Sequence, residues 1–252
     1  MLKIISSRIS IICISLIVSY FISDVYENIL GFILILSIGV VHGANDLLII
    51  NKYSKKETKR SEALYFFYYL TIVFLGFVFF YVFPSIALLT FVIVSIYHFG
   101  EQHWEVNLSK SDYVNLNKIF LFIFHGIIFF TIIFMNNLKI VNEVLSSFNI
   151  NPLENYYLVL ALIVFSILYF LFLLYLKNLR KYLFSEGIFF SLLFLLTINT
   201  TLIFGFAIYF IFFHSLLSIK DQIKFIYDDD NPKNLKKYII TSMPYFILAL
   251  TF

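Results

Sequence analysis

Histidine is the side chain of this sequence that is best placed to do chemistry, because it occurs inside long apolar runs where other ionisable residues are scarce. An ionisable group within an apolar membrane segment is costly and is usually functional. Neutral imidazole is the commonest metal ligand in proteins, and histidines without cysteines suit iron, zinc or copper better than magnesium or calcium. The chain has five histidines, and we expect some of them to form a metal site: His42, His98, His103, His125 and His214.

Most of these histidines are expected at one depth in a membrane. Each stands a few residues from the basic end of its own apolar run, and the rise of an α-helix places it roughly 9–14 Å inside the cytoplasmic boundary. Imidazoles in one layer favour a shared site over separate buried histidines. We interpret His103, which lies nearer the boundary, as interfacial rather than as a ligand. The histidines expected in the layer are His42, His98, His125 and His214.

The residues around His42 indicate close helix packing and support for a metal ligand. Gly39 and Gly43 form a pair of small residues one turn apart, which lets a neighbouring helix approach closely. Asp46 shares the face of His42, where it could accept a hydrogen bond from a ligand imidazole. Pairing of Asp46 with an interfacial lysine fits the same position equally well.

The other histidines also have polar neighbours. Glu101 follows His98 on the same helical face, and we expect it to support that imidazole from outside the ligand set. Gln222 lies shortly after His214 and is expected in the same supporting role. Trp104, the only tryptophan, is interpreted as an anchor at the membrane interface.

The composition sets the class of protein. Hydrophobic residues make up 61% of the 252 residues and charged residues only 13%, which excludes a soluble domain and a disordered chain. The apolar runs have helical length, unlike the alternating strands of a membrane barrel. A net charge of +3, spread between the runs, argues against nucleic acid as a partner, and the single cysteine, Cys13, excludes a disulfide framework.

A span needs about 20 apolar residues. We interpret the first apolar run as a retained span and not as a signal peptide, because no cleavage site follows it. A ninth apolar run begins near Tyr238 and ends at Phe252. This run is short for a span, which leaves open that the chain is truncated there. The eight longer runs predict helices at roughly 4–22, 29–50, 63–83, 85–104, 118–136, 156–176, 182–199 and 201–219.

The basic residues of the connecting loops predict the orientation. Of the 18 lysines and arginines, all but Lys139 fall in alternate loops, which also contain the N-terminus. Because such loops stay in the cytoplasm, we expect a cytoplasmic N-terminus. The sequence therefore predicts an all-α, polytopic transmembrane helical bundle of about eight to nine spans. We expect one integral membrane domain over residues 1–252, in the cell (inner or plasma) membrane.

These residues resemble the Brp/Blh family of membrane β-carotene 15,15′-dioxygenases. The resemblance extends over nearly the whole chain in order, spacing and helical context, and the first, second and last of its four patches are the specific ones. The patches are His42-Gly43-Ala44-Asn45-Asp46, Ser95-Ile96-Tyr97-His98-Phe99-Gly100-Glu101, His125-Gly126 and Tyr209-Phe210-Ile211-Phe212-Phe213-His214-Ser215.

The resemblance implies one non-haem Fe(II) held by four histidines. The positions that match are His42, His98 and His214. The family's fourth histidine falls here on Ser218, so that ligand is unassigned. We expect His125 to take its place because of its depth, with His103 and Gln222 as weaker candidates.

The implied activity is oxidative cleavage of β-carotene, or a close relative, by dioxygen at the central double bond to give retinal. Part of the aromatic residues, which reach 21% of the chain, would line a slot for the polyene. The resemblance also implies a downstream retinal-binding partner such as a rhodopsin. The missing fourth histidine favours an alternative, a non-catalytic membrane protein that binds carotenoid or retinal. A transporter with metal or proton coupling is a third reading, disfavoured because no span interior carries lysine or arginine.

Overall fold

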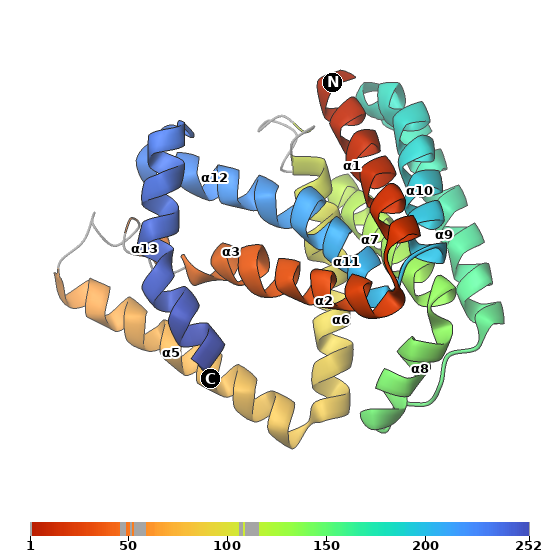
Figure 1. Ribbon diagram of the computed structural model, residues 1–252. Helices are drawn as coiled ribbons and strands as arrows, with labels where there is room; N and C mark the ends of the chain where they lie inside the picture. The colour runs from red at the N-terminus through yellow and green to blue at the C-terminus, as the bar shows by residue number, and fades with distance from the viewer. Residues whose placement is uncertain are drawn as a thin grey trace.

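The computed structural model describes residues 2–45, 49–50, 52, 59–105, 108 and 116–251. Within these ranges the regular structure is helical and contains no strand, which confirms the expected all-α class. Figure 1 shows that α7, α9 and α10 lie together on one side of the molecule, whereas α5 lies on the opposite side and joins this bundle through α6.

The helices follow the chain with short connections. The first half contains α1 (Leu2–Phe21), α2 (Asp24–Leu34), the π-helical segment η1 (Ile35–Gly39), α3 (Val40–Ala44), α5 (Lys59–Val82) and α6 (Pro84–Glu105). The second half contains α7 (Leu116–Asn136), α8 (Leu138–Ser147), α9 (Asn155–Tyr175), the 3-10 segment η3 (Lys177–Tyr182), α10 (Leu183–Ile198), α11 (Leu202–Tyr209), the π-helical segment η4 (Phe210–Ser215), α12 (Leu216–Tyr227) and α13 (Pro232–Thr251).

Six helical stretches of the described residues are long and apolar enough to cross a membrane, which supports a multi-pass membrane protein. They coincide with the second, fourth, fifth, sixth, seventh and eighth predicted spans. The first and third predicted spans correspond to α1 and α5, whose apolar stretches, Ile9–Phe21 and Phe67–Val82, are shorter. The six are Asp24–Gly43, Pro84–Glu105, Lys118–Asn136, Asn155–Tyr175, Lys177–Ile198 and Leu202–Tyr227.

Two helices differ from the sequence-based expectation. α13 begins at Pro232 and not near Tyr238, because the Asn231 side chain accepts a hydrogen bond from Asn234 N at 2.9 Å and caps the helix one residue before the proline. α8 was not predicted, since it is too short and too mixed in polarity to register as an apolar run. The side chain of Asn142 on α8 fixes the following connection by bonding Leu153 N at 2.8 Å and Leu153 O at 3.0 Å.

The buried core centres on α7 and is unusually rich in aromatic rings. Trp104, Phe129, Tyr169, Tyr209 and Phe213 are almost completely buried and come from five different helical elements. Such rings pack well in edge-to-face and offset arrangements. The core therefore joins α6, α7, α9, α11 and η4 into one packed unit.

Two glycines allow α6 and α7 to touch through their backbones. A Cβ atom at Gly100 would overlap the Phe122 carbonyl group, and one at Gly126 would overlap that of Ile96. Only residues without a side chain permit this approach. The contact fixes the register of the two helices that carry His98, His103 and His125.

Two interrupted helices pack side by side in parallel. Gly31 of α2 lies against Ile203 of α11, and Gly39 of η1 lies against the Phe210 ring of η4, with 2.6 Å between a Cβ placed on Gly39 and Phe210 Cε1. The π-helical segments η1 and η4 contact each other midway along the α2–α3 and α11–α12 helices. Figure 1 shows these two helices next to each other. A π-helical turn contains an extra residue and re-aims the side chains that follow, and it is frequent at functional sites.

Candidate metal centre

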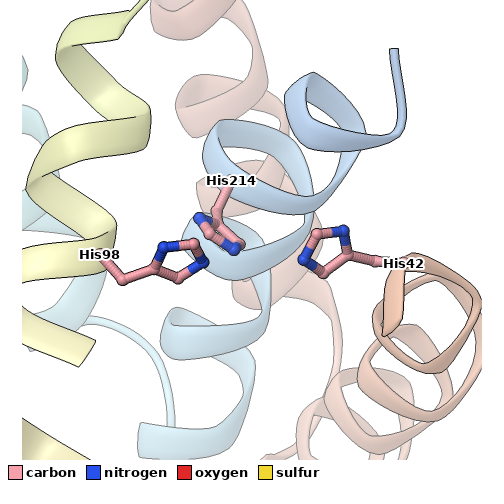
Figure 2. A group of neighbouring side chains, drawn as sticks. All are labelled: His42, His98 and His214. Carbon is pink, nitrogen blue, oxygen red and sulfur yellow. The ribbon is translucent and has the colours of Figure 1, made fainter. Parts of the chain in front are cut away.

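His42, His98 and His214 converge on one point from α3, α6 and η4. Figure 2 shows the three imidazoles pointing toward one another from separate helices. Each offers one nitrogen, and these nitrogens all lie within 4.8 Å of one another. The ring centroids of His98 and His214 are 4.7 Å apart, and those of His42 and His214 are 5.3 Å apart. We call these three residues the histidine triad.

The parallel packing of the two interrupted helices brings together two of the three triad residues, His42 and His214. The contacts of Gly31 with Ile203 and of Gly39 with Phe210 set a register in which His42 falls opposite His214. His214 lies within η4 and His42 follows η1 after a few residues, so both π-helical segments influence how the imidazoles are aimed. Packing of α6 against η4 adds His98.

The environment of His214 fits a metal ligand. Its side chain is 2% exposed, and its Nδ1 atom has no hydrogen-bond partner among the described residues. The ring stacks on Phe210 with centroids 5.5 Å apart and lies 4.8 Å from the Phe99 ring. A buried polar atom without a partner is unfavourable by about 1–3 kcal/mol, and metal coordination would remove that cost. The three imidazoles together therefore fit a transition-metal ion.

One side of the triad is open. The His98 side chain is 48% exposed, in contrast to buried His214. Phe91 and Val94, which precede His98 on the same face of α6, are also more than half exposed, at 55% and 60%. Because α6 is one of the apolar stretches long enough to cross a membrane, this face leads from the hydrocarbon region to the triad.

Gln222 of α12 supports His42. Its Nε2 atom lies 3.5 Å from His42 Nδ1 and 3.4 Å from the His42 carbonyl oxygen. Its Oε1 atom accepts a short hydrogen bond from the Tyr238 hydroxyl of α13, which is completely buried. Gln222 thus lies beside the imidazole of His42, and Tyr238 is a neighbour that the sequence did not suggest.

Glu101 lies next to His98. Its carboxylate oxygen Oε2 is 3.8 Å from His98 Nδ1, and Oε1 accepts a hydrogen bond of 3.2 Å from the Tyr97 hydroxyl. A carboxylate on the second nitrogen of a ligand imidazole fixes the tautomer and orientation of the ring. Asp46, the other carboxylate expected in this role, lies outside the described residues.

Ser218 lines a pocket next to Gln222. The pocket has a volume of about 230 Å³ and is also lined by Ile49, Gln102, Glu105, Asp221, Gln222 and Phe225. Gln222 is the residue common to this pocket and to the surroundings of His42. A side chain longer than serine at position 218 therefore has room next to Gln222, which contacts His42.

His125 does not join the triad. It lies in a second group with His103 and Glu186, in which one donor atom from each residue lies within 4.8 Å of the others. All three residues are buried, and the two imidazole rings stack with centroids 3.9 Å apart. The expectation that His125 supplies the fourth ligand of the triad is not met, because the packing of α7 directs its side chain toward Glu186 of α10.

His103 and Trp104, interpreted from the sequence as interfacial, point into the helical bundle. Both side chains are completely buried. Trp104 packs against Tyr182 and Tyr169, because η3 and α9 cover the last turn of α6. His103 Nε2 lies 3.1 Å from each carboxylate oxygen of Glu186.

Glu186 is the site residue that the sequence reading missed. It is a buried carboxylate at 2% exposure, near the start of α10 in a stretch otherwise long and apolar enough to cross a membrane. A lone acid in such a run was the available signal, since intramembrane carboxylates are costly and usually paired.

Comparison with known proteins identifies a family. The family model described as Beta-carotene 15,15'-dioxygenase matches residues 33–252. No curated protein and no solved structure matches the chain. The matched region contains the triad and the second group, and it begins within α2.

Proposed function

The chain belongs to the β-carotene 15,15′-dioxygenase family, and we propose that it cleaves β-carotene, or a close relative, with dioxygen at the central double bond. The products would be two molecules of retinal. In this proposal the histidine triad of His42, His98 and His214 holds Fe(II), with water or another group in the remaining coordination positions.

The observation that carries the proposal is the convergence of three imidazoles from three apolar helices. Their nitrogens lie within 4.8 Å of one another, and the buried Nδ1 atom of His214 has no hydrogen-bond partner among the described residues. A histidine set without cysteine suits iron, zinc or copper. The family match supports a dioxygenase chemistry for this set.

Bound Fe(II) would supply the activation of dioxygen, and the chain's own residues would position the polyene. Phe99 and Phe210 contact His214, and Phe206 stacks on Phe210 with an interplanar angle of 11°. Flat aromatic walls beside the triad would hold an extended conjugated chain and select which double bond faces the metal. They would also keep water away from the reacting carbons.

The open side of the triad suits a substrate dissolved in the bilayer. β-Carotene is a hydrocarbon and resides in the membrane interior. It could reach His98 along the exposed apolar face formed by Phe91 and Val94 without entering water. Product retinal could leave by the same route toward a retinal-binding protein such as a rhodopsin.

A non-catalytic carotenoid- or retinal-binding protein is the second candidate. The observation in its favour is Ser218, which stands where the resemblance places a fourth histidine and offers no strong iron ligand. Such a protein would retain the aromatic walls and lose turnover.

Expression in cells that accumulate β-carotene tests the two candidates. Loss of colour with formation of retinal, measured by chromatography of extracted pigments, supports the oxygenase. Persistent colour with carotenoid co-purifying with the folded chain supports the binding protein. His42→Ala and His214→Ala should abolish retinal formation, whereas Ser215→Ala, next to His214, should not, since the buried Ser215 hydroxyl has no partner among the described residues. Full activity of either histidine variant would contradict the ligand assignment.

The membrane arrangement belongs to the same proposal. We place the chain in the cell membrane as one integral domain of eight to nine spans, with α1 and α5 completing the six longer apolar helices and α13 as the ninth. The N-terminus would be cytoplasmic, because the lysines and arginines other than Lys139 fall in alternate loops. Reporter fusions at successive loops would test this topology.

A further inference from the structure

His103, His125 and Glu186 form a polar group inside the most tightly packed part of the bundle. They come from α6, α7 and α10, and each has an exposed fraction of 2% or less. Phe99 and Tyr209 connect this group to the triad, since Phe99 contacts both His214 and Tyr209, and the Tyr209 hydroxyl lies 3.2 Å from His125 Nε2. The proposed cleavage of carotenoid by the triad assigns no role to this group.

We propose that these three residues form a second metal site, which binds a divalent transition metal such as Fe(II), Mn(II) or Zn(II). Two histidines and one carboxylate are the ligand set of many non-haem iron sites, and they leave further coordination positions open. This site is separate from the triad and does not depend on the proposed reaction.

The distances between the donor atoms fit ligands of one ion. His103 Nε2 lies 3.1 Å from both Glu186 oxygens, and His125 Nδ1 lies 3.8 Å from Glu186 Oε2. Ligands bound at about 2.0–2.1 Å in neighbouring positions of an octahedron are about 3.0 Å apart. Small side-chain movements would therefore bring all three donors onto one metal.

The outer partners are those expected around metal ligands. The Tyr169 hydroxyl donates a hydrogen bond of 2.8 Å to Glu186 Oε2. His125 places Nε2 against the Tyr209 hydroxyl at 3.2 Å, so donation of the Nε2 proton would leave the lone pair on Nδ1, which lies 3.8 Å from Glu186 Oε2 and 3.5 Å from the Tyr169 hydroxyl. Such partners fix the tautomer of a ligating histidine and the orientation of a ligating carboxylate.

The competing arrangement is a buried ion pair between protonated His103 and Glu186. Glu186 lies closer to His103, at 3.1 Å, than to His125, at 3.8 Å, so an ion pair engages mainly His103. A metal would bind both imidazoles together with the carboxylate. Metal content distinguishes the two states directly.

The test removes the triad and asks whether metal remains. Full-length protein in detergent is loaded anaerobically with Fe(II), desalted and analysed for metal and protein. We expect about two metal equivalents in the native chain, about one in the variant H42A/H98A/H214A, and close to none when Glu186→Gln is added to that variant. Glu154→Gln, the same change at an exposed position, should leave one equivalent.

A second measurement leaves Glu186 intact, so that a folding defect caused by its replacement cannot be mistaken for loss of the metal site. Co(II) added to the folded variant H42A/H98A/H214A should give d–d absorption bands, and Tyr169→Phe should alter their positions without abolishing them. Absence of both metal and Co(II) bands from this variant, when it elutes as folded protein, would overturn the second site and support the ion pair. So would metal content that survives both Glu186→Gln and His103→Ala in the triad variant.

The outcome is independent of carotenoid cleavage. A native chain that makes no retinal, together with a triad variant that keeps one metal, would contradict the proposed function and support the second site. If the native chain forms retinal and binds one metal equivalent, and the triad variant binds none, the proposed function is supported and the second site is contradicted.

Discussion

His42 and His214 face each other across two parallel helices, with ring centroids 5.3 Å apart and planes at 86°, although they lie near opposite ends of the chain. Both helices contain a π-helical segment close to the histidine, and the two segments pack against each other. The two helices approach closely at Gly31 and Gly39, so the pairing of His42 with His214 depends on these small residues. The predictions below test the packing that positions the triad and the residues that support it.

Gly39→Ala should weaken metal binding at the triad. The added Cβ would lie 2.6 Å from Phe210 Cε1, so the Phe210 ring must move, and this ring stacks on His214. We expect a several-fold loss of iron affinity and of retinal formation. Gly43→Ala is the matched control, because a Cβ there meets nothing within 4 Å although Gly43 directly follows His42. Equal losses in both variants would contradict this packing.

Gly100→Ala should destabilise the whole bundle. The new Cβ would overlap the Phe122 backbone, which cannot rotate away, and would separate α6 from α7. Overpacking of this kind typically costs about 1–3 kcal/mol, and a backbone clash belongs at the upper end. Thermal unfolding in detergent measures the effect. Gly76→Ala on exposed α5 has open space at its Cβ and should leave the melting temperature unchanged or slightly raised.

Gln222→Leu should reduce iron affinity without changing the number of sites. Gln222 contacts both the ring and the carbonyl group of His42, and loss of such an outer partner typically lowers metal affinity about 10–100-fold. Tyr238→Phe removes the hydroxyl bonded to Gln222 and should lower the iron affinity by a smaller factor. Competition with a chelator provides the affinities.

The control for the hydroxyl is Tyr227→Phe. Tyr227 bonds Thr241 at 3.3 Å between α12 and α13 and does not contact His42. An iron affinity that falls as much in this variant as in Tyr238→Phe would indicate a general loosening of α13 and not a specific contact.

Ser218→His should strengthen iron binding and raise retinal formation. Position 218 follows His214 by one turn and lines a pocket of about 230 Å³, so an imidazole there has space and shares the face of His214. Iron affinity and product yield should both increase relative to the native chain. Ser218→Phe fills the pocket without offering a nitrogen and should not raise either quantity. If it does, packing and not coordination explains the gain.

The limits of the sequence are clearest at His125 and Glu186. The position of His125 along its helix predicts only a depth, and two helices with residues at equal depth can lie on opposite sides of a bundle. The hydropathy of the sequence does not indicate which neighbouring helix His125 faces. Glu186 shows a different limit, because its partners Tyr169 and His103 lie on other helices and no spacing in the sequence links them.

By itself, the sequence determined the class of protein, most of the apolar helices and the family, since the composition and local patches that specify them are written along the chain. It also identified His42, His98 and His214 as companions, through the patches that resemble the family. The tertiary structure alone decided that His125 belongs with His103 and Glu186, and that Trp104 is buried. The physical reason is that backbone contacts at Gly100 and Gly126 fix how α6 meets α7. Helix packing of this kind selects neighbours across the bundle, which periodicity along one helix cannot do.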